Sequence, residues 1–159
     1  MTEPPPTIAR ASAADAADLL AMMRSYCDFY EVSPTDDALE TIITALREDP
    51  EHEGVQLIAR EAGGSACAFA TVYWTWSTTD GCRIGIMNDL FVVPSARGRG
   101  IADALIDACR DECARHGARI LQWQTAPDNA RAQAVYDRVG GVRSQWIDYS
   151  LAVPDPPNP

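Results

Sequence analysis

Apolar residues recur at helical spacing in four stretches, and these predict helices over about 16–30, 36–49, 100–117 and 128–139. Ser12 or Asp15 would cap the first of them. The stretch 100–117 is the clearest, because apolar and charged residues separate onto opposite sides. Its predicted buried face consists of Ile101, Leu105, Cys109 and Cys113, and its predicted water-facing side of Asp107, Arg110, Asp111 and Arg115.

Shorter apolar runs, several rich in β-branched and aromatic residues, predict six strands. These strands span 7–12, 55–61, 66–76, 83–93, 120–125 and 144–153. The turn AGGS joins 55–61 to 66–76 as an antiparallel hairpin. A strand at 83–93, a helix and a strand at 120–125 follow in succession, which implies a right-handed crossover and a parallel pair. The chain is therefore expected to adopt a mixed α/β fold.

Length and composition indicate one globular domain. The chain has 159 residues, 47% of them hydrophobic, which suffices for one core. We expect the domain over 7–153, between proline-rich tails at 1–6 and 154–159. The apolar runs are shorter than the roughly 20 residues of a membrane-spanning helix, and the start lacks a signal-peptide pattern. These features predict a cytoplasmic protein that does not associate with membranes.

The net charge of -10 opposes binding to nucleic acid or anionic membranes. It is also the ordinary charge of a solvated acidic surface, but it would attract a cationic acceptor such as an amine. The five cysteines form no CxxC pair and the two histidines lie far apart in sequence. We therefore expect reduced, packed cysteines and no metal site.

The segment PSARGRGIADAL, residues 94–105, places two glycines and two arginines directly before the clearest helix. Unpaired N–H groups at a helix start, at the positive end of its dipole, bind anions, and Arg97 and Arg99 would add charge. A tight connection with arginines exposed for solubility is the alternative. A Walker loop is excluded because no Gly-Lys-Ser/Thr follows, and a dinucleotide fingerprint because Asp103 replaces its third glycine.

Two spaced motifs make the chain similar to the GCN5-related N-acetyltransferases (GNAT). The run Arg97-Gly98-Arg99-Gly100-Ile101-Ala102 matches that family's Arg/Gln-x-x-Gly-x-Gly/Ala loop, and Asn129, Ala132 and Tyr136 match its Asn-x-x-Ala-x-x-x-Tyr helix. Within the family, the chain looks most like the polyamine, histone and small-amine subgroup. The resemblance implies a mostly antiparallel central sheet with one splayed parallel strand pair, flanked by about four helices.

The resemblance also implies a site. Acetyl-CoA would be the cosubstrate, its pyrophosphate held by the amides from Gly98 to Asp103. Its pantetheine arm would meet open backbone groups of Leu90, Phe91 and Val92, and the side chain of Asn129. That asparagine could equally cap a helix. Tyr136 would protonate the departing thiolate; an aromatic packing role is the alternative.

Asn88 and Asp89 interrupt an apolar strand, so we predict that they face the substrate. Strand alternation puts Asp89 on the face of Met87 and Phe91, and Asn88 on the opposite face. The subgroup often carries Glu-Asp at this point, and the missing glutamate removes one candidate base for the amine. An acceptor wall is a further candidate role, although tryptophans in strands are more often core or interface; it would consist of Tyr73, Trp74 and Trp76 with Tyr30 and Glu31.

These features together predict an acetyl-CoA-dependent N-acetyltransferase that acts on a small primary amine by direct attack in a ternary complex. A peptide or histone-like acceptor is the first alternative. A non-catalytic acyl-CoA-binding module is the second, and thiol release would distinguish it. The resemblance also implies a homodimer, with the apolar run SQWIDYSL suited to pairing through the last strands.

Overall fold

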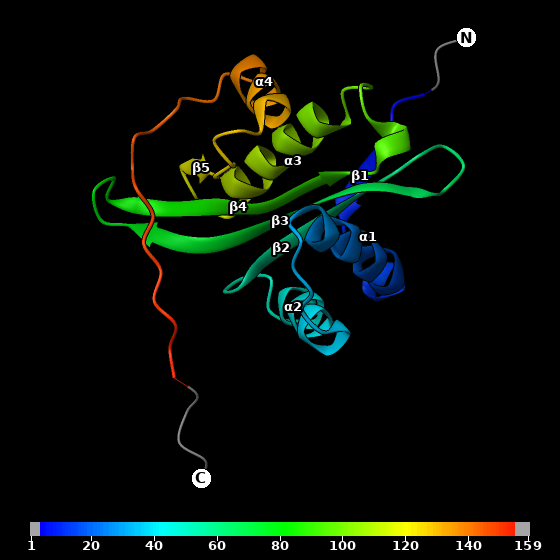
Figure 1. The fold of residues 1–159 in the computed structure, drawn as a ribbon, viewed down its shortest axis with the longest axis horizontal. Coiled ribbons are helices and arrows are strands. Elements are labelled where there is room, and N and C mark those ends of the chain that lie inside the picture. Colours follow the sequence, from blue (N-terminus) through cyan, green and yellow to red (C-terminus); the bar gives the residue numbers. More distant parts are fainter. Residues whose placement is uncertain (1–3, 155–159) are drawn as a thin grey trace.

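The computed structural model describes residues 4–154, which form a five-stranded sheet with helices on both faces (Figure 1). The strands are β1 (Thr7–Arg10), β2 (Gly54–Arg60), β3 (Ala66–Ser77), β4 (Cys82–Val92) and β5 (Ile120–Gln122), and they lie side by side in that order. The first four pair antiparallel, and β4 and β5 pair parallel. The mixed, mostly antiparallel sheet predicted from the sequence is confirmed.

Two helices cover each face of the sheet (Figure 1). Helices α1 (Ala16–Phe29) and α2 (Asp36–Glu48) cover one face, and α3 (Ile101–Arg115) and α4 (Ala130–Arg138) the other. Short 3-10 turns precede α1 at Ala13–Asp15 and α3 at Pro94–Ala96. Local capping fits the sequence, because Ser12 and Asp15 bond to each other before α1 and Thr35 accepts from the Ala38 amide at the start of α2.

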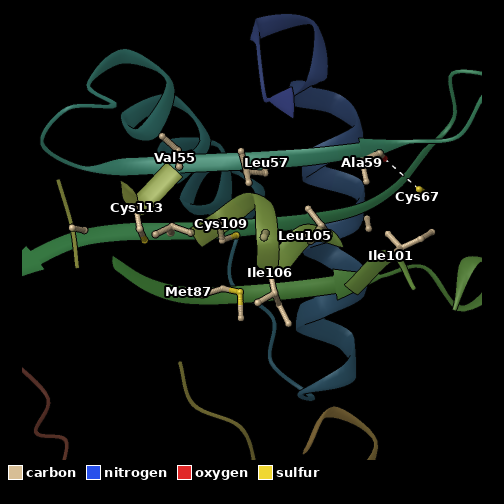
Figure 2. Packing of buried hydrophobic residues seen from close by; sticks show 14 of the residues in the cluster. Val55, Leu57, Ala59, Cys67, Met87, Ile101, Leu105, Ile106, Cys109 and Cys113 are labelled. Carbon is tan, nitrogen blue, oxygen red and sulfur yellow. Dashed lines mark hydrogen bonds between the residues drawn. The ribbon is translucent and has the colours of Figure 1, made fainter. Parts of the chain in front are cut away.

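The predicted apolar face of α3 is buried against the sheet, where Figure 2 shows Leu105, Cys109 and Cys113 beside β2 and β4. All five cysteines are buried and unpaired. Gly85 of β4 lies directly under the last turn of α3. A Cβ atom at this position would lie 2.6 Å from the Cys113 sulfur, so the absence of a side chain sets how closely α3 approaches.

One charged residue of α3 that the helical pattern did not identify is also buried. Glu112 is 5% exposed and accepts hydrogen bonds from Arg10 of β1, at 2.9 and 2.6 Å. Arg115 contacts the same carboxylate from one turn along the helix. The two guanidinium groups compensate the buried charge, and the bonds from Arg10 connect α3 to the edge strand β1.

A β-bulge at Asn88 changes which side chains share a face of β4. Thr71 of β3 lies opposite Asp89, whereas the next residue, Val72, lies opposite Met87, so Asn88 is the extra residue. Met87 therefore packs under α3, and Phe91 packs with α1 and α2. The prediction that Asp89 shares a face with Met87 is wrong, because simple alternation does not continue through a bulge.

The predicted last strand, SQWIDYSLAV, does not form. Residues 144–153 are extended but belong to no strand, and their side chains are exposed. A strand needs a neighbouring backbone to satisfy its N–H and C=O groups, and this segment donates or accepts no backbone hydrogen bond within residues 4–154. The apolar pattern of residues 144–153 alone is therefore insufficient to form a strand.

The remaining sequence predictions concern the end of the first strand, the two tails, membrane spans and metal sites. The first strand ends at Arg10, two residues earlier than expected. Parts of the two predicted tails, residues 1–3 and 155–159, lie outside the described residues. Within 4–154, no helix has the length and hydropathy to cross a bilayer, and no group of three or more His, Cys, Asp or Glu side chains is placed to hold a metal ion.

Candidate active site

The loop between β4 and α3 holds two glycines in the left-handed conformation. Gly98 has φ 77° and Gly100 has φ 76°, values that favour glycine. The first hydrogen bond of α3 runs from the Ala104 amide to the Gly100 carbonyl. Within residues 4–154, no hydrogen bond is donated by the amides of Gly98, Gly100, Ile101 or Ala102. These donors are thus available to an anion at the positive end of the helix.

The two arginines of this loop have different partners. Arg97 turns back to β4, where its Nε donates to the Val92 carbonyl at 2.9 Å and its guanidinium lies 5.9 Å from the centre of the Phe91 ring. Arg99 forms an ion pair with Glu61 of the β2–β3 turn at 2.6 Å and does not line the cleft described next. Arg97 therefore shapes the cleft wall, and Arg99 fastens the loop to the neighbouring hairpin.

A cleft of about 720 Å³ opens beside this loop, between α1, β4, α3 and α4. It brings together most of the cofactor residues predicted from the sequence: Leu90, Phe91, Val92, Arg97, Gly98, Gly100, Ile101, Ala102, Asp103, Asn129 and Tyr136. Asn88, Asp89 and Arg99 do not line it. Its walls include side chains that sequence reasoning did not assign to the cofactor: Tyr26, Phe29, Tyr30, Arg131 and Arg138.

The cleft exists because β4 and β5 pair over only a short distance. Their ladder runs from Ile84–Ile120 to Ile86–Gln122 and stops there, so the parallel pair separates beyond that point. Within residues 4–154, the edge of β4 from Met87 to Val92 consequently has no strand beside it on the β5 side. The Val92 carbonyl on that edge is taken by Arg97. The remaining edge can pair with an extended ligand.

A carboxylate at the start of α3 is neutralised from α4. Asp103 accepts hydrogen bonds from Arg138 Nε at 2.9 Å and from Nη2 at 2.7 Å. This bidentate pair lowers the pKa of Asp103. Because both residues line the cleft, Arg138 also offsets the repulsion that an unpaired carboxylate would exert on a bound anion. Because the two residues lie 35 positions apart in sequence, no local sequence pattern could reveal this contact.

The three residues of the second motif, Asn129, Ala132 and Tyr136, all line the cleft from α4 and its N-cap. Asn129 caps the helix, since its side-chain oxygen accepts from the Ala132 amide at 3.1 Å. Its Nδ2 donates to no residue within 4–154 and remains available to a ligand. Tyr136, two turns later, packs edge-on against Trp123 with ring centres 5.3 Å apart. Capping and cleft lining are thus both properties of Asn129.

Three phenol groups gather around one part of the cleft. Tyr26 and Tyr30 of α1 have ring centres 5.0 Å apart, and both line the cleft together with Tyr136. Burial, and secondarily the neighbouring Tyr30, raises the pKa of Tyr136. Burial likewise raises the pKa of Tyr26, with a smaller contribution from Asp89. Tyr26 and Tyr136 therefore carry their protons at neutral pH.

A buried carboxylate lies behind this group of tyrosines. Asp89 is 8% exposed, and burial raises its pKa, although the neighbouring Thr71, Asn88 and Tyr26 side chains lower it in part. Asn88 Nδ2 donates to Asp89 Oδ1 at 3.1 Å, and the Tyr26 hydroxyl donates to the Asn88 carbonyl at 3.4 Å. Tyr26 therefore connects the cleft to the carboxylate.

The aromatic wall considered from the sequence is only partly present. Tyr30 lines the cleft, and Tyr73 lies near Asp89, where burial and that carboxylate raise its pKa to about 12. Trp74 instead stacks on His116 at 4.1 Å, and Trp76 is 69% exposed beneath Arg83. Neither tryptophan lines the cleft, because alternation along β3 directs both toward the α3 side of the sheet.

Comparisons with known proteins agree with this architecture. The model of the acetyltransferase (GNAT) family matches residues 19–141. An uncharacterized N-acetyltransferase of Bacillus subtilis (strain 168), YhfO, is 35% identical over 148 residues, covering 92% of this chain and 97% of the relative. An aminoglycoside N(6')-acetyltransferase type 1 of Salmonella typhimurium is 29% identical over 89 residues, covering 54% of this chain and 61% of the relative.

A solved structure gives the same fold. Aminoglycoside N-acetyltransferase AAC(6')-Iy in complex with CoA superposes with a TM-score of 0.81 at 22% identity, covering 96% of this chain and 97% of the other. The family model spans most of the chain, and the Bacillus relative is similar over nearly its whole length. The chain therefore belongs to the acetyltransferase (GNAT) family and is an acetyl-CoA-dependent N-acetyltransferase.

Proposed function

We propose that this enzyme acetylates a primary amine of a small molecule, with Tyr136 as the acid and Asp89 as the group that receives the amine proton. The observation that carries the proposal is one cleft that joins unbonded loop amides, three phenols and, through Tyr26, a buried carboxylate. When bound, acetyl-CoA supplies the acetyl thioester that is transferred to the amine.

The residues of the loop fit the diphosphate of such a cosubstrate. The free amides of Gly98, Gly100, Ile101 and Ala102 converge at the start of α3, where the helix dipole favours negative charge. Arg131, which also lines the cleft, adds positive charge. The open edge of β4 at Leu90 and the Asn129 Nδ2 group would hold the extended arm by hydrogen bonds.

Gly98→Ala should weaken the binding of CoA about tenfold or more. The left-handed φ of 77° costs an L-residue roughly 1–2 kcal/mol, and the loop would relax away from the geometry that collects the amides. Titration calorimetry with CoA measures the effect. Gly117→Ala is the matched control, because Gly117 has φ 76° and open space at the other end of α3. Equal affinity in both variants would remove the loop from the binding site.

The position of Tyr136 in the cleft supports its proposed role as the acid that acts on the departing sulfur. Its phenol lines the cleft, and its raised pKa keeps the proton on Oη at neutral pH. A leaving thiolate is a strong acceptor of a hydrogen bond or a proton from such a phenol. Trp123 packs against the ring edge-on and restricts its motion, so the hydroxyl is held in one direction.

Burial and the contact with Tyr26 support Asp89 as the group that receives the proton that a reactive amine must lose. An alkylammonium ion is not nucleophilic, so one proton must leave the nitrogen before or during attack. The raised pKa of Asp89 makes this carboxylate a better proton acceptor than an exposed aspartate. Tyr26 lines the cleft and interacts with the Asp89 carboxylate, so its Oη would accept the proton of the amine while it donates its own proton to Asp89.

The charge of the protein favours a cationic acceptor. The net charge of -10 attracts a cation. Two similar proteins are named as aminoglycoside N-acetyltransferases, which supports a polyamine-like acceptor here. The cytoplasmic location remains a prediction.

A panel of acceptors tests the proposal directly. We expect thiol release from acetyl-CoA in the presence of polyamines, aminoglycosides or amino acids, and little release with histone-tail peptides. Preference for peptides would replace the small-molecule assignment. Tight binding of acetyl-CoA without release of CoA, over the whole panel, would instead favour the non-catalytic acyl-CoA-binding module.

A further inference from the structure

Three buried polar side chains form one row across the sheet, on the face that α1 covers (Figure 1). Gln56 of β2 lies opposite Thr71 of β3, and Thr71 lies opposite Asp89 of β4. Their exposed fractions are 5%, 0% and 8%. The bulge at Asn88 brings Asp89 into register with Thr71. Side chains directly opposite each other on one face of a sheet are close enough to interact, so the row can act as one hydrogen-bonded unit.

The neighbouring row on the same face shows that the sheet can be packed here with apolar side chains. Ile58, Phe69 and Phe91, each two residues away on the same three strands, lie opposite one another and pack with α1 and α2. Burying a polar group costs free energy that an apolar side chain would not cost. A role in the site therefore explains the polar row better than packing of the core does.

The contacts within the row determine where the hydroxyl hydrogen of Thr71 points. Gln56 Nε2 donates to Thr71 Oγ1 at 3.2 Å and to Met23 Sδ at 3.6 Å. A thioether sulfur accepts hydrogen bonds and cannot donate them, so Met23 favours the amide orientation in which the NH2 group faces both partners. The Thr71 oxygen thus accepts from Gln56. Its one hydrogen is left for the Asp89 carboxylate, with which Thr71 forms a side-chain hydrogen bond.

The groups around Asp89 are mostly uncharged at neutral pH. Titratable side chains near the carboxylate come from two elements: Tyr26 and Cys27 of α1, and Tyr73 of β3. Burial is the main cause that raises the pKa of each, so all three keep their protons. Burial also raises the pKa of Asp89, and the hydrogen bond from Thr71 is the largest effect that lowers it. Hydrogen bonds from neutral groups therefore stabilise the ionised carboxylate.

We propose that Thr71 and Gln56 are positioning residues for Asp89. The Gln56 amide fixes the Thr71 hydroxyl, and the hydroxyl stabilises the ionised carboxylate that accepts the amine proton. This role rests on the proposed function of Asp89. Neither Thr71 nor Gln56 lines the cleft, so both act through Asp89 and not on a substrate. Because a donated hydrogen bond favours the charged form, the row keeps a buried aspartate able to accept a proton at a lower pH than burial alone would allow.

NMR titration of the Asp89 carboxyl carbon in the free protein tests this role without using activity. Thr71→Val replaces the hydroxyl by a methyl group and keeps the branched shape, so the midpoint of the titration should move to higher pH. Thr71→Ser keeps the hydroxyl and should leave the midpoint near that of the wild type, although it removes a buried methyl group. Gln56→Met keeps a long side chain without a donor, and should move the midpoint in the same direction as Thr71→Val but less far.

The pH dependence of acetyl transfer should follow the same order. On the rising part of the profile, Thr71→Val should be about tenfold slower than the wild type at a given pH, because one hydrogen bond to a charged group is lost. At high pH the two rates should converge, since Asp89 is then ionised in both proteins. KM for acetyl-CoA should not change, because neither residue of the row lines the cleft.

Two results of the NMR titration would overturn the positioning role. One is an unchanged midpoint in Thr71→Val, and the other is an equal shift in Thr71→Ser, which would trace the effect to packing. A shift in Thr71→Val with none in Gln56→Met would overturn the part assigned to Gln56. The proposed function fails separately: if the midpoints move as expected but the wild-type rate does not follow the titration of Asp89, this carboxylate does not accept the amine proton and the hydrogen-bonded row still stands.

Discussion

Tyr136→Phe should lower kcat by about 10²–10⁴-fold, the usual contribution of one positioned proton donor. The ring would still pack against Trp123, so the fold and the cleft are expected to remain. The Kd for acetyl-CoA should change much less than kcat, because the loop amides lie on a different element. Steady-state thiol release measures kcat, and calorimetry on the same preparation measures the Kd for acetyl-CoA.

Tyr30→Phe is the matched control for that experiment. Tyr30 also lines the cleft and is the neighbour that, after burial, raises the pKa of Tyr136, so its removal deletes a second phenol at the same place. A larger fall in kcat for Tyr30→Phe than for Tyr136→Phe would transfer the role of acid to Tyr30. Unchanged turnover in both variants would leave the leaving sulfur without a protein donor.

Asp89→Asn should reduce kcat/KM by about 10²-fold or more, since the amide cannot accept a proton from the amine. The wild-type rate should rise with pH as Asp89 ionises, at a pH above the usual range of an aspartate because burial raises its pKa. That rise should be absent from the pH profile of the variant. Tyr26→Phe should lower the rate while the rise remains, because the carboxylate is still present.

Asp89→Asn should also stabilise the protein at neutral and alkaline pH. The folded-state pKa of Asp89 is raised, so its protonated form is favoured in the native state, and stability falls as pH rises through that pKa. The amide side chain of the variant carries no charge to bury, so the free energy of unfolding should be higher in Asp89→Asn at pH 8. Below the unfolded-state pKa of about 4 the advantage should vanish. Higher stability of the wild type at pH 8 would mean that its carboxylate is fully compensated by hydrogen bonds.

Much of the fold could be predicted from local sequence patterns. The apolar face of α3 is visible as a periodicity of 3.6 residues, and the hairpin is visible as two short apolar runs joined by the turn AGGS. Both formed as predicted. The loop at Gly98 and Gly100 is recognisable because only glycine tolerates its φ values well. Such features depend on neighbours in sequence, which is why one sequence suffices to find them.

Features that depend on contacts between residues far apart in sequence could not be predicted from local patterns. The bulge at Asn88 inserts one residue into an otherwise regular alternation, and only the register with β3 reveals it. Arg138 reaches Asp103 from another helix, and the Tyr26 hydroxyl reaches the Asn88 carbonyl across 62 residues of chain. Strand propensity likewise identified residues 144–153 as strand-like, but a strand forms only beside a second backbone segment, which the local pattern does not reveal.

Gly85 affects the direction of the first turn of α3, the end of the helix that we propose binds the cosubstrate's diphosphate. The helix has 15 residues and is therefore about 22 Å long, with its final turn resting on Gly85 and its first turn carrying the free amides. A methyl group at position 85 would push the last turn of α3 away from the sheet. Because the helix is rigid, its first turn would then tilt away from Leu90 and Tyr136. In the proposed site, alignment of the cosubstrate would thus depend on the absence of a side chain at the opposite end of the helix.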